Sequence, residues 1–433
     1  MNSASDSSKS HSFLIFVFAL LSFFPSDGYL LLLNVAVIIV FFRVLGFKYV
    51  ILFAGVSIFT FAGAILQSHL YVKGYILAFL NFSSLIYIFY AREVQDQELT
   101  SLTRFARFYV LLSLLQIPIQ IFQFMRVYGL DLAQFITNSS AGDEALGTIG
   151  NSALLADKQL LALFMLWYFR KEYSRSWWFF MFIALSLSFL VIGANHTILA
   201  LLFAALVFVT TTLFQFQSIK LLTQKVGVVA LLFVSIYGVL RFLLESQYQY
   251  ISDTLGHVAN SLEYAGKIRA YLGAYEVFTR HTGLLITGLG LGTFASRAAF
   301  MLSGEYLWQG KLALFGVERS VFFEQQMFPL WNRQITDIQY LAGTVNQPFS
   351  TYLAVLSECG IIVFAVFLIY CGRVLWYFHR HDAFMYFLVL FLMTMLFIDN
   401  FLEFPRFIAP FLFFVFSLYK NHSYYASRRE TLT

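Results

Sequence analysis

The sequence is poor in charged residues, proline and cysteine. Only 12% of its 433 residues are charged, whereas soluble domains are about 25% charged. Six prolines leave little sequence for a Pro-rich linker or a disordered domain. The two cysteines, Cys359 and Cys371, lie in one apolar stretch and are interpreted as core residues, so Cys-based zinc and iron–sulfur sites are excluded.

Long apolar runs are what the sequence has instead, with 60% hydrophobic residues. A helix needs roughly 20 apolar residues to cross a hydrocarbon core about 30 Å thick. The predicted fold class is therefore an all-α polytopic integral membrane protein with about twelve transmembrane helices. The expected spans are 12–25, 28–42, 49–67, 74–91, 107–125, 151–169, 177–193, 196–215, 225–244, 348–371, 383–399 and 404–420.

The distribution of lysine and arginine predicts the topology, because cytoplasmic loops carry an excess of both. If the N-terminus is inside, the inside segments hold most of the 28 basic residues, and the short outside loops hold almost none. Both termini are thus expected in the cytoplasm. The predicted organisation is spans one to nine in 1–244, one large periplasmic loop in 245–347, and spans ten to twelve with a cytoplasmic tail in 348–433.

Four short motifs follow one another along the chain. They read GTIGNSALLA at 147–156, IGANHTILALLFAAL at 192–206, GKIRAYLGAYEVFTRHTGLLITGLGLGTF at 266–294 and PFSTYLAVLSECGII at 348–362. The basic helix followed by G-x-G-x-G-T-F resembles a hallmark of the superfamily of O-antigen polymerases (Wzy type) and O-antigen ligases. The other three motifs resemble parts of the same superfamily, in the same order.

The resemblance implies a glycosyltransferase of the bacterial inner membrane. Its substrates would be oligosaccharides linked to undecaprenyl pyrophosphate, as donor and as acceptor, and its surroundings the lipid bilayer. A chain-length regulator is a further candidate partner, whereas no cofactor and no nucleic acid is expected. The resemblance also makes Arg269, at the start of the basic helix, a functional arginine.

Two departures favour a repeat-unit polymerase over a ligase. His196 stands where the superfamily has an arginine. Phe349 stands where the superfamily has the histidine that opens the later span. Ligation of glycan to lipid A core remains an alternative. A flippase or other transporter is an alternative of another class, although no internal repeat is visible and the loop at 245–347 is long for a transporter.

Transfer of a glycan from a lipid pyrophosphate needs cations near the leaving group and a base near the acceptor hydroxyl. Arg269, Gly273, Glu276 and Arg280 are spaced i, i+4, i+7 and i+11, so they share one face of a helix. We expect the arginines to bind phosphate, Glu276 either to orient one of the arginines or to accept a proton, and Gly273 to admit a ligand to the backbone. The bland alternative is a solvated face with ion pairs.

Further candidates lie elsewhere in the chain. Arg297, Arg319 and Arg333 in the large loop are expected to bind substrate, although surface ion pairing is the ordinary alternative. His196 and Glu358, both inside predicted spans, are candidate catalytic residues, because polar residues in a membrane are costly. We expect Glu358 to pair with Arg269 or Lys158.

No set of His, Asp and Glu has metal-ligand spacing, so a metal-independent mechanism is predicted, with arginines in the role of the metal. The glycine run GLGLGT at 288–293 is not followed by the strand–turn–helix pattern of a nucleotide site. We therefore expect it to form a close turn that brings the loop back toward the bilayer.

Overall fold

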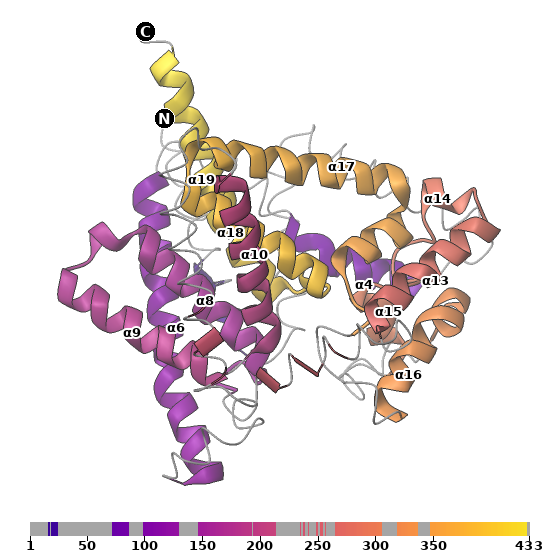
Figure 1. The fold of residues 1–433 in the computed structure, drawn as a ribbon, viewed down its shortest axis with the longest axis horizontal. Coiled ribbons are helices and arrows are strands. Elements are labelled where there is room, and N and C mark those ends of the chain that lie inside the picture. The colour runs from indigo at the N-terminus through magenta and orange to yellow at the C-terminus, as the bar shows by residue number, and fades with distance from the viewer. Residues whose placement is uncertain are drawn as a thin grey trace, which may run out of the picture. The chain divides into compact units, whose positions relative to one another are not determined.

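The structure is a computed structural model, drawn as a ribbon in Figure 1. It describes residues 16–24 except 18, 72–85, 98–129, 146–192, 194–213, 265–304, 318–336 and 347–430, with isolated positions between 234 and 256. Within these ranges every regular element is a helix and no strand occurs. The chain divides into two compact units, and each is described by itself.

The first unit comprises residues 1–26, 96–255 and 378–394. Helix α8 is its centre, since α8 packs against α6 and α9 and also contacts α10. The beginning of α18 adds aromatic side chains, and Phe164 of α8 packs edge-on against Phe384, Phe387 and Phe391. The helices of this unit are α6 (Glu98–Tyr128), α8 (Ser152–Tyr168), η3 (Arg170–Glu172), α9 (Arg175–Ile192), α10 (Asn195–Leu213) and the first part of α18 (Ala383–Ile398).

The motif at 147–156 is the turn and N-cap that begin α8. Gly147 and Gly150 have positive φ angles of 58° and 72°, which glycine adopts without strain. Asn151 is extended, and its side chain accepts a hydrogen bond from the N–H of Leu154 at 2.9 Å. An asparagine in this position satisfies one of the helix's free donors, so the local sequence fixes where α8 starts.

The second unit comprises residues 27–95, 256–377 and 395–433. Helix α15 packs against α4, and α13 packs against η6 and α16. Two apolar clusters hold these contacts, one around Phe294, Phe300 and Phe323 and one around Leu77 and Met301. The helices are α4 (Val72–Phe82), η1 (Ser83–Leu85), α13 (Gly266–Arg280), α14 (Leu284–Thr287), α15 (Arg297–Leu302), η6 (Phe323–Met327), α16 (Phe328–Thr336), α17 (Thr351–His381), η7 (Phe401–Glu403) and α19 (Pro405–Glu430).

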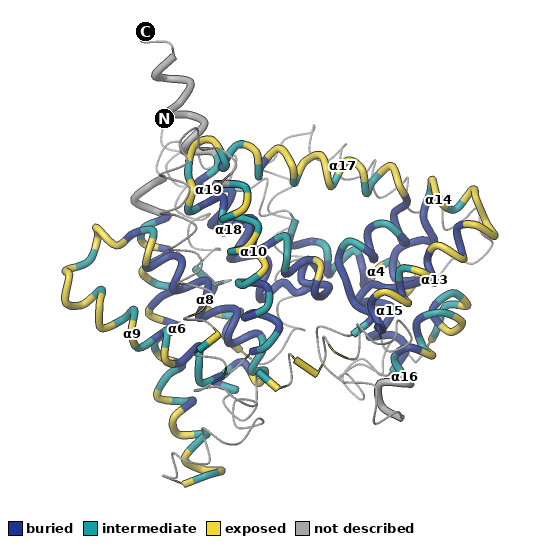
Figure 2. Tube along the Cα trace, in the orientation of Figure 1, coloured by how far each residue is buried: buried dark blue, intermediate teal, exposed yellow. Residues whose placement is uncertain are grey.

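Three helices among the described residues are long and apolar enough to cross a membrane: Leu102–Tyr128, Arg175–Ile192 and Thr351–His381. Shorter apolar helices occupy Val72–Leu85, Asn195–Thr211, Ala383–Ile398 and Pro405–Tyr419. Figure 2 shows long exposed stretches on α17 and α9, as expected of helices that face lipid. These helices coincide with seven of the expected spans, and the all-helical membrane class is confirmed to this extent.

The finer topology stays a prediction. Expected spans at 28–42 and 49–67 lie outside the described residues, and 225–244 is described only at isolated positions. The count of twelve spans, the periplasmic side of the loop and the cytoplasmic termini are likewise untested by helix length and composition.

Candidate functional site

Helix α13 has three faces, and one of them fixes it to the second unit. Ala270, Ala274 and Val277 are buried, together with Phe278. They belong to an apolar cluster with residues of η6 and α16 such as Met327. The expected helix is therefore confirmed, and its buried face leaves the opposite side exposed.

Three of the four charged residues of α13 lie together on its exposed side. Arg269, Glu276 and Arg280 are all exposed, and the Arg280 guanidinium lies 3.9 Å from the Glu276 carboxylate. Within the described residues no ion pair joins Arg269. This stripe of Arg269, Glu276 and Arg280, which we call the charged stripe, presents two guanidinium groups to a ligand from solvent.

Gly273 does not belong to the charged stripe, so the expectation that it admits a ligand is wrong. It is buried against η6, and a Cβ there would lie 2.9 Å from Oε1 of Gln326. The space beside this glycine is therefore filled by a glutamine side chain. In helical projection Gly273 lies at the border of the buried face, which the i, i+4 spacing by itself does not distinguish from the exposed one.

A buried lysine anchors the start of α13. The Lys267 ammonium donates hydrogen bonds to the carbonyl of Phe349 and, at 2.7 Å, to that of Ile398 at the end of α18. A cation is favoured at a helix C-terminus because the carbonyls there lack partners. Burial lowers the pKa of Lys267 to about 7, while Asp399 opposes that shift. Lys267 thus holds the turn that carries Arg269, a role that its place in a basic loop did not indicate.

The end of the glycine run at 288–293 and the residues just after it surround the carboxylate of Glu358. That carboxylate accepts hydrogen bonds from the N–H groups of Gly292 at 2.6 Å, Phe294 at 2.9 Å and Ser296 at 2.8 Å. The expectation that Arg269 or Lys158 pairs with Glu358 is therefore wrong. Backbone N–H groups that converge in a turn form a concave anion site, and here an internal carboxylate fills it.

Positive φ angles make this close turn possible. Gly288, Gly290 and Gly292 have φ angles of 79°, 94° and 77°. A Cβ on Gly288 would lie 2.3 Å from the carbonyl oxygen of Glu358, and one on Gly360 would lie 2.2 Å from that of Ile286. Two backbones therefore meet at contact distance, and the expected close turn is confirmed.

Arg297 and Glu403 form a second buried charge site. The Glu403 carboxylate accepts from the N–H groups of Arg297 at 3.0 Å and Ala298 at 3.3 Å, where it caps the start of α15. The Arg297 guanidinium donates to the Glu403 carbonyl at 3.3 Å and lies 3.8 Å from the centre of the Phe404 ring. Burial raises the pKa of Glu403 to about 8. Arg297 therefore faces protein groups rather than solvent.

The two remaining loop arginines are less informative. Arg319 is half-buried, with its guanidinium 3.9 Å from the centre of the Phe328 ring. Arg333 lies in α16, but its side chain is outside the described part. The structure thus brings Arg269, Glu276 and Arg280 together and leaves Arg297 and Arg319 packed on aromatic rings of their own unit.

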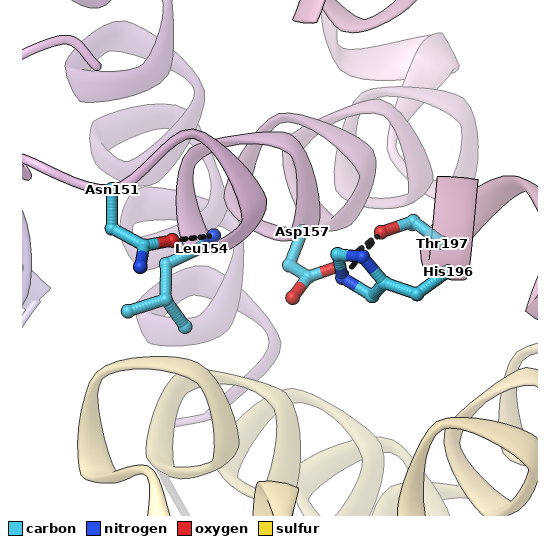
Figure 3. A network of polar contacts seen from close by, with 5 residues as sticks. All are labelled: Asn151, Leu154, Asp157, His196 and Thr197. Atoms are coloured by element: carbon cyan, nitrogen blue, oxygen red, sulfur yellow. Dashed lines mark hydrogen bonds and ion pairs between the residues drawn. The ribbon is translucent and has the colours of Figure 1, made fainter. Parts of the chain in front are cut away.

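In the first unit, the two helices that begin in the motifs at 147–156 and 192–206 meet at a buried carboxylate, shown in Figure 3. Thr197 of α10 donates to Asp157 of α8 at 2.7 Å, and Nε2 of His196 lies 3.7 Å from the same carboxylate oxygen. The Thr197 hydroxyl also lies 3.0 Å from His196 Nε2. All three side chains are buried, so His196 is part of a side-chain network between α8 and α10.

Lys158, next to Asp157 in sequence, is also buried. Its ammonium donates to the Ser22 hydroxyl at 2.7 Å and lies 4.4 Å from the centre of the Phe23 ring. Such a cation is expected to be costly unless it finds polar and aromatic partners. The N-terminal segment supplies both, so Lys158 ties α8 to residues 22–23.

A glutamine network that the sequence analysis missed continues this polar core. Gln159 of α8 donates to Gln120 of α6 at 3.3 Å and to Ser188 of α9 at 2.6 Å. Gln116 accepts from the N–H of Thr148 at 2.8 Å. The signal was available, since amide side chains inside apolar helices usually hydrogen-bond across helices.

Comparisons with known proteins do not assign this chain to a family. The chain was compared with protein-family models, with curated proteins and with solved structures, and no match was found. Among the described residues, no group of three His, Cys, Asp or Glu side chains is arranged to hold a metal ion.

Proposed function

We propose that this protein is a membrane glycosyltransferase that polymerises repeat units linked to undecaprenyl pyrophosphate, at the periplasmic face of the bacterial inner membrane. The observation that carries the proposal is the charged stripe of α13. Two exposed arginines and one exposed carboxylate share one side of a helix whose opposite side is buried. The order of the four motifs supports the same superfamily, and the apolar helices support a membrane location.

The residues of the stripe suit the chemistry of this transfer. The acceptor hydroxyl attacks the anomeric carbon of the donor, and the bond between that carbon and the phosphate oxygen breaks. The hydroxyl proton passes to a base, and Glu276 is the carboxylate of the stripe that can take this role. The lipid pyrophosphate leaves with the bonding electrons. Arg269 and Arg280 stabilise the charge that develops on the leaving group.

Lys267 and Glu358 are positioning residues in this proposal. Lys267 holds the first turn of α13 to the carbonyls of Phe349 and Ile398. Glu358 holds the turn that follows α14 through three backbone N–H groups. Neither group faces solvent, so each acts by fixing the elements on either side of the charged stripe.

The test is chain extension by protein reconstituted in nanodiscs with a lipid-linked repeat unit. We expect Arg269→Ala to lower extension at least about 100-fold, because a cation at a developing oxyanion is usually worth about 10²–10³ in rate. Arg269→Lys should retain part of the activity, since lysine keeps the charge but not the fork. Lys73→Ala is the matched control, because Lys73 is a half-exposed cation of the same unit, paired with Glu318 at 3.0 Å.

The outcomes separate the alternatives. If folded Arg269→Ala protein extends chains at the wild-type rate, the assignment of the charged stripe as the active site is contradicted. In cells, a polymerase defect gives core lipid capped with a single repeat, whereas a ligase defect gives long polymer that stays on the carrier lipid.

Transport of a lipid-linked glycan is the second candidate, and the buried polar core of the first unit favours it. Asp157, Lys158 and His196 are all buried in a bundle of apolar helices, and such residues often line a transport path. If Asp157→Asn stops glycan translocation across proteoliposome membranes while Arg269→Ala does not, the transporter replaces the polymerase.

A further inference from the structure

The exposed side of α13 carries an apolar stripe beside the charged one. Ile268, Leu272 and Tyr275 are spaced i, i+4 and i+7, so they lie on one face of the helix. Their exposed fractions are 40%, 50% and 67%. The helix thus has a buried face, an exposed apolar face and an exposed charged face. A helix surrounded only by water would not be expected to expose an apolar face of this kind.

The apolar stripe is followed in sequence by a second exposed apolar turn. Leu285 and Ile286 in α14 are 39% and 51% exposed. Helix α14 reaches α17 where the backbones of Ile286 and Gly360 meet, since a Cβ on Gly360 would lie 2.2 Å from the Ile286 carbonyl oxygen. The next residue of α17 after Gly360 is Ile361, so exposed isoleucines of both helices lie beside this contact.

Helix α17 identifies what covers this surface. It is one of the helices long and apolar enough to span a membrane, and its exposed side chains include Ile361, Ile362, Val366 and Ile369. An exposed apolar face of this length is expected to contact the hydrocarbon of a bilayer. Because α14 adjoins the kink of α17 at Gly360, the exposed apolar residues of α14 are continuous with a lipid-facing surface.

We propose that α13 and α14 lie in the interface of the bilayer as an amphipathic hairpin, with Ile268, Leu272, Tyr275, Leu285 and Ile286 inserted among the lipid chains. Lipid, rather than another protein, therefore covers the apolar stripe. With that stripe in the acyl region, the charged stripe lies at the level of the lipid phosphates, and Arg269 and Arg280 are complementary to anionic headgroups. The placement of the helix does not depend on glycosyl transfer.

One consequence does rest on the proposed function. A pyrophosphate carried on a polyprenyl chain lies at the same depth as the headgroup phosphates, because its tail remains in the hydrocarbon. Such a substrate would reach Arg269 by lateral diffusion within the leaflet, without leaving the membrane. The charged stripe would then bind lipid diphosphates in general. It would recognise the charge of the pyrophosphate and its depth in the bilayer rather than the attached sugars.

Depth-dependent fluorescence quenching tests the placement. Single cysteines at Leu272, Ile286 and Glu324 are labelled with a small fluorophore in a Cys359→Ala, Cys371→Ser background, in nanodiscs that contain about 30% anionic lipid. Glu324 is the control, since it is an exposed residue of η6. We expect spin-labelled lipids to quench positions 272 and 286 at least threefold more than position 324, and aqueous iodide to show the reverse order.

Two results would overturn the proposal. If iodide quenches position 272 as strongly as position 324, the stripe faces water. If neither quencher reaches position 272, a protein surface, such as a second copy of the chain, covers it. Should the cysteine-free background fail to fold, a fluorescent amino acid incorporated at 272 in the otherwise unchanged chain gives the same readout.

The quenching is independent of catalysis, so the two proposals fail separately. Arg269→Ala protein that loses chain extension but keeps lipid quenching at 272 supports both. Loss of lipid contact in wild-type protein that still extends glycans would contradict the interfacial helix alone.

Discussion

The two units of this protein bury carboxylates in different ways. In the first unit, Asp157 is bound by side chains, the hydroxyl of Thr197 and the imidazole of His196. In the second, Glu358 is bound by three backbone N–H groups of a glycine-rich turn. A hydroxyl or an imidazole can either donate or accept, whereas a backbone N–H can only donate. The first arrangement therefore tolerates a change of partner that the second does not.

Substitution of the carboxylates by amides gives the largest expected difference. Glu358→Gln places an amide nitrogen against N–H donors, so at least one donor loses its acceptor in a buried site. We expect a loss of about 3 kcal/mol or more in the free energy of unfolding. Asp157→Asn should cost about 1 kcal/mol, because Thr197 and His196 can reorient their protons.

The measurement is thermal unfolding in detergent. A thiol-reactive dye reports exposure of the buried Cys359 in the second unit. Tryptophan fluorescence reports both units, because each contains three of the six tryptophans. Equal destabilisation by Glu358→Gln and Asp157→Asn would show that the nature of the donors does not matter.

Glycine substitutions sharpen the same comparison at the level of the backbone. A Cβ on Gly288 would meet the backbone of Glu358 at 2.3 Å, whereas one on Gly147 would meet the side chains of Gln116 at 2.7 Å and Leu155 at 2.9 Å. Side chains can move and backbone cannot, so Gly288→Ala should destabilise by more than about 3 kcal/mol and Gly147→Ala by about 1–3 kcal/mol.

Gly129 is the matched control for these two glycines. It has a φ of 67° and nothing within 4 Å of a built Cβ, so Gly129→Ala measures only the cost of the left-handed conformation, about 1–2 kcal/mol. The same dye and fluorescence readouts apply. A Gly288→Ala variant that unfolds at the same temperature as Gly129→Ala would rule out the close backbone contact.

The most gradual expected effect is a pH dependence that arises from Glu403 in the second unit. Burial raises the pKa of Glu403 from 4.5 to about 8, so the folded protein binds a proton that the unfolded chain releases. Stability from this group is fully present below pH 4.5 and falls as pH rises toward 8, by at most about 1.4 kcal/mol per pH unit.

Lys267 acts in the opposite sense but in another range. Its pKa is lowered from 10.5 to about 7, so its contribution rises only above about pH 7. Between pH 5 and pH 7 Glu403 should therefore make the free energy of unfolding fall as the pH rises. Unfolding temperatures at about pH 5, 6 and 7 should fall more steeply in wild type than in Glu403→Gln, while an equal fall in both proteins would contradict the raised pKa of Glu403.

Sequence patterns anticipated features that depend on local spacing. The apolar runs predicted the seven apolar helices that the structure describes, because a stretch of about 20 apolar residues in lipid must satisfy its backbone internally. The charged stripe followed from the spacing of Arg269, Glu276 and Arg280. The glycines at 288–293 predicted a close turn, because residues without Cβ tolerate positive φ.

Features that depend on distant partners were missed or misassigned. Glu358 was expected to pair with a cation, yet its partners are backbone groups more than sixty residues away. Nothing in the sequence distinguishes the buried Arg297 from the exposed Arg280, because both are arginines in a basic loop. Lys267 and Arg269 lie two residues apart on one helix, yet one is buried and the other exposed.

The sequence by itself determined that this chain is helical and built for a membrane, and it determined which charges share a helix face. Both follow from periodicity and local chemistry, which need no knowledge of neighbours. Only the tertiary structure decided which of those charges meet solvent, which lie against aromatic rings and which are held by backbone N–H groups. Those outcomes depend on what packs beside each residue, and segments far apart in the chain supply that packing.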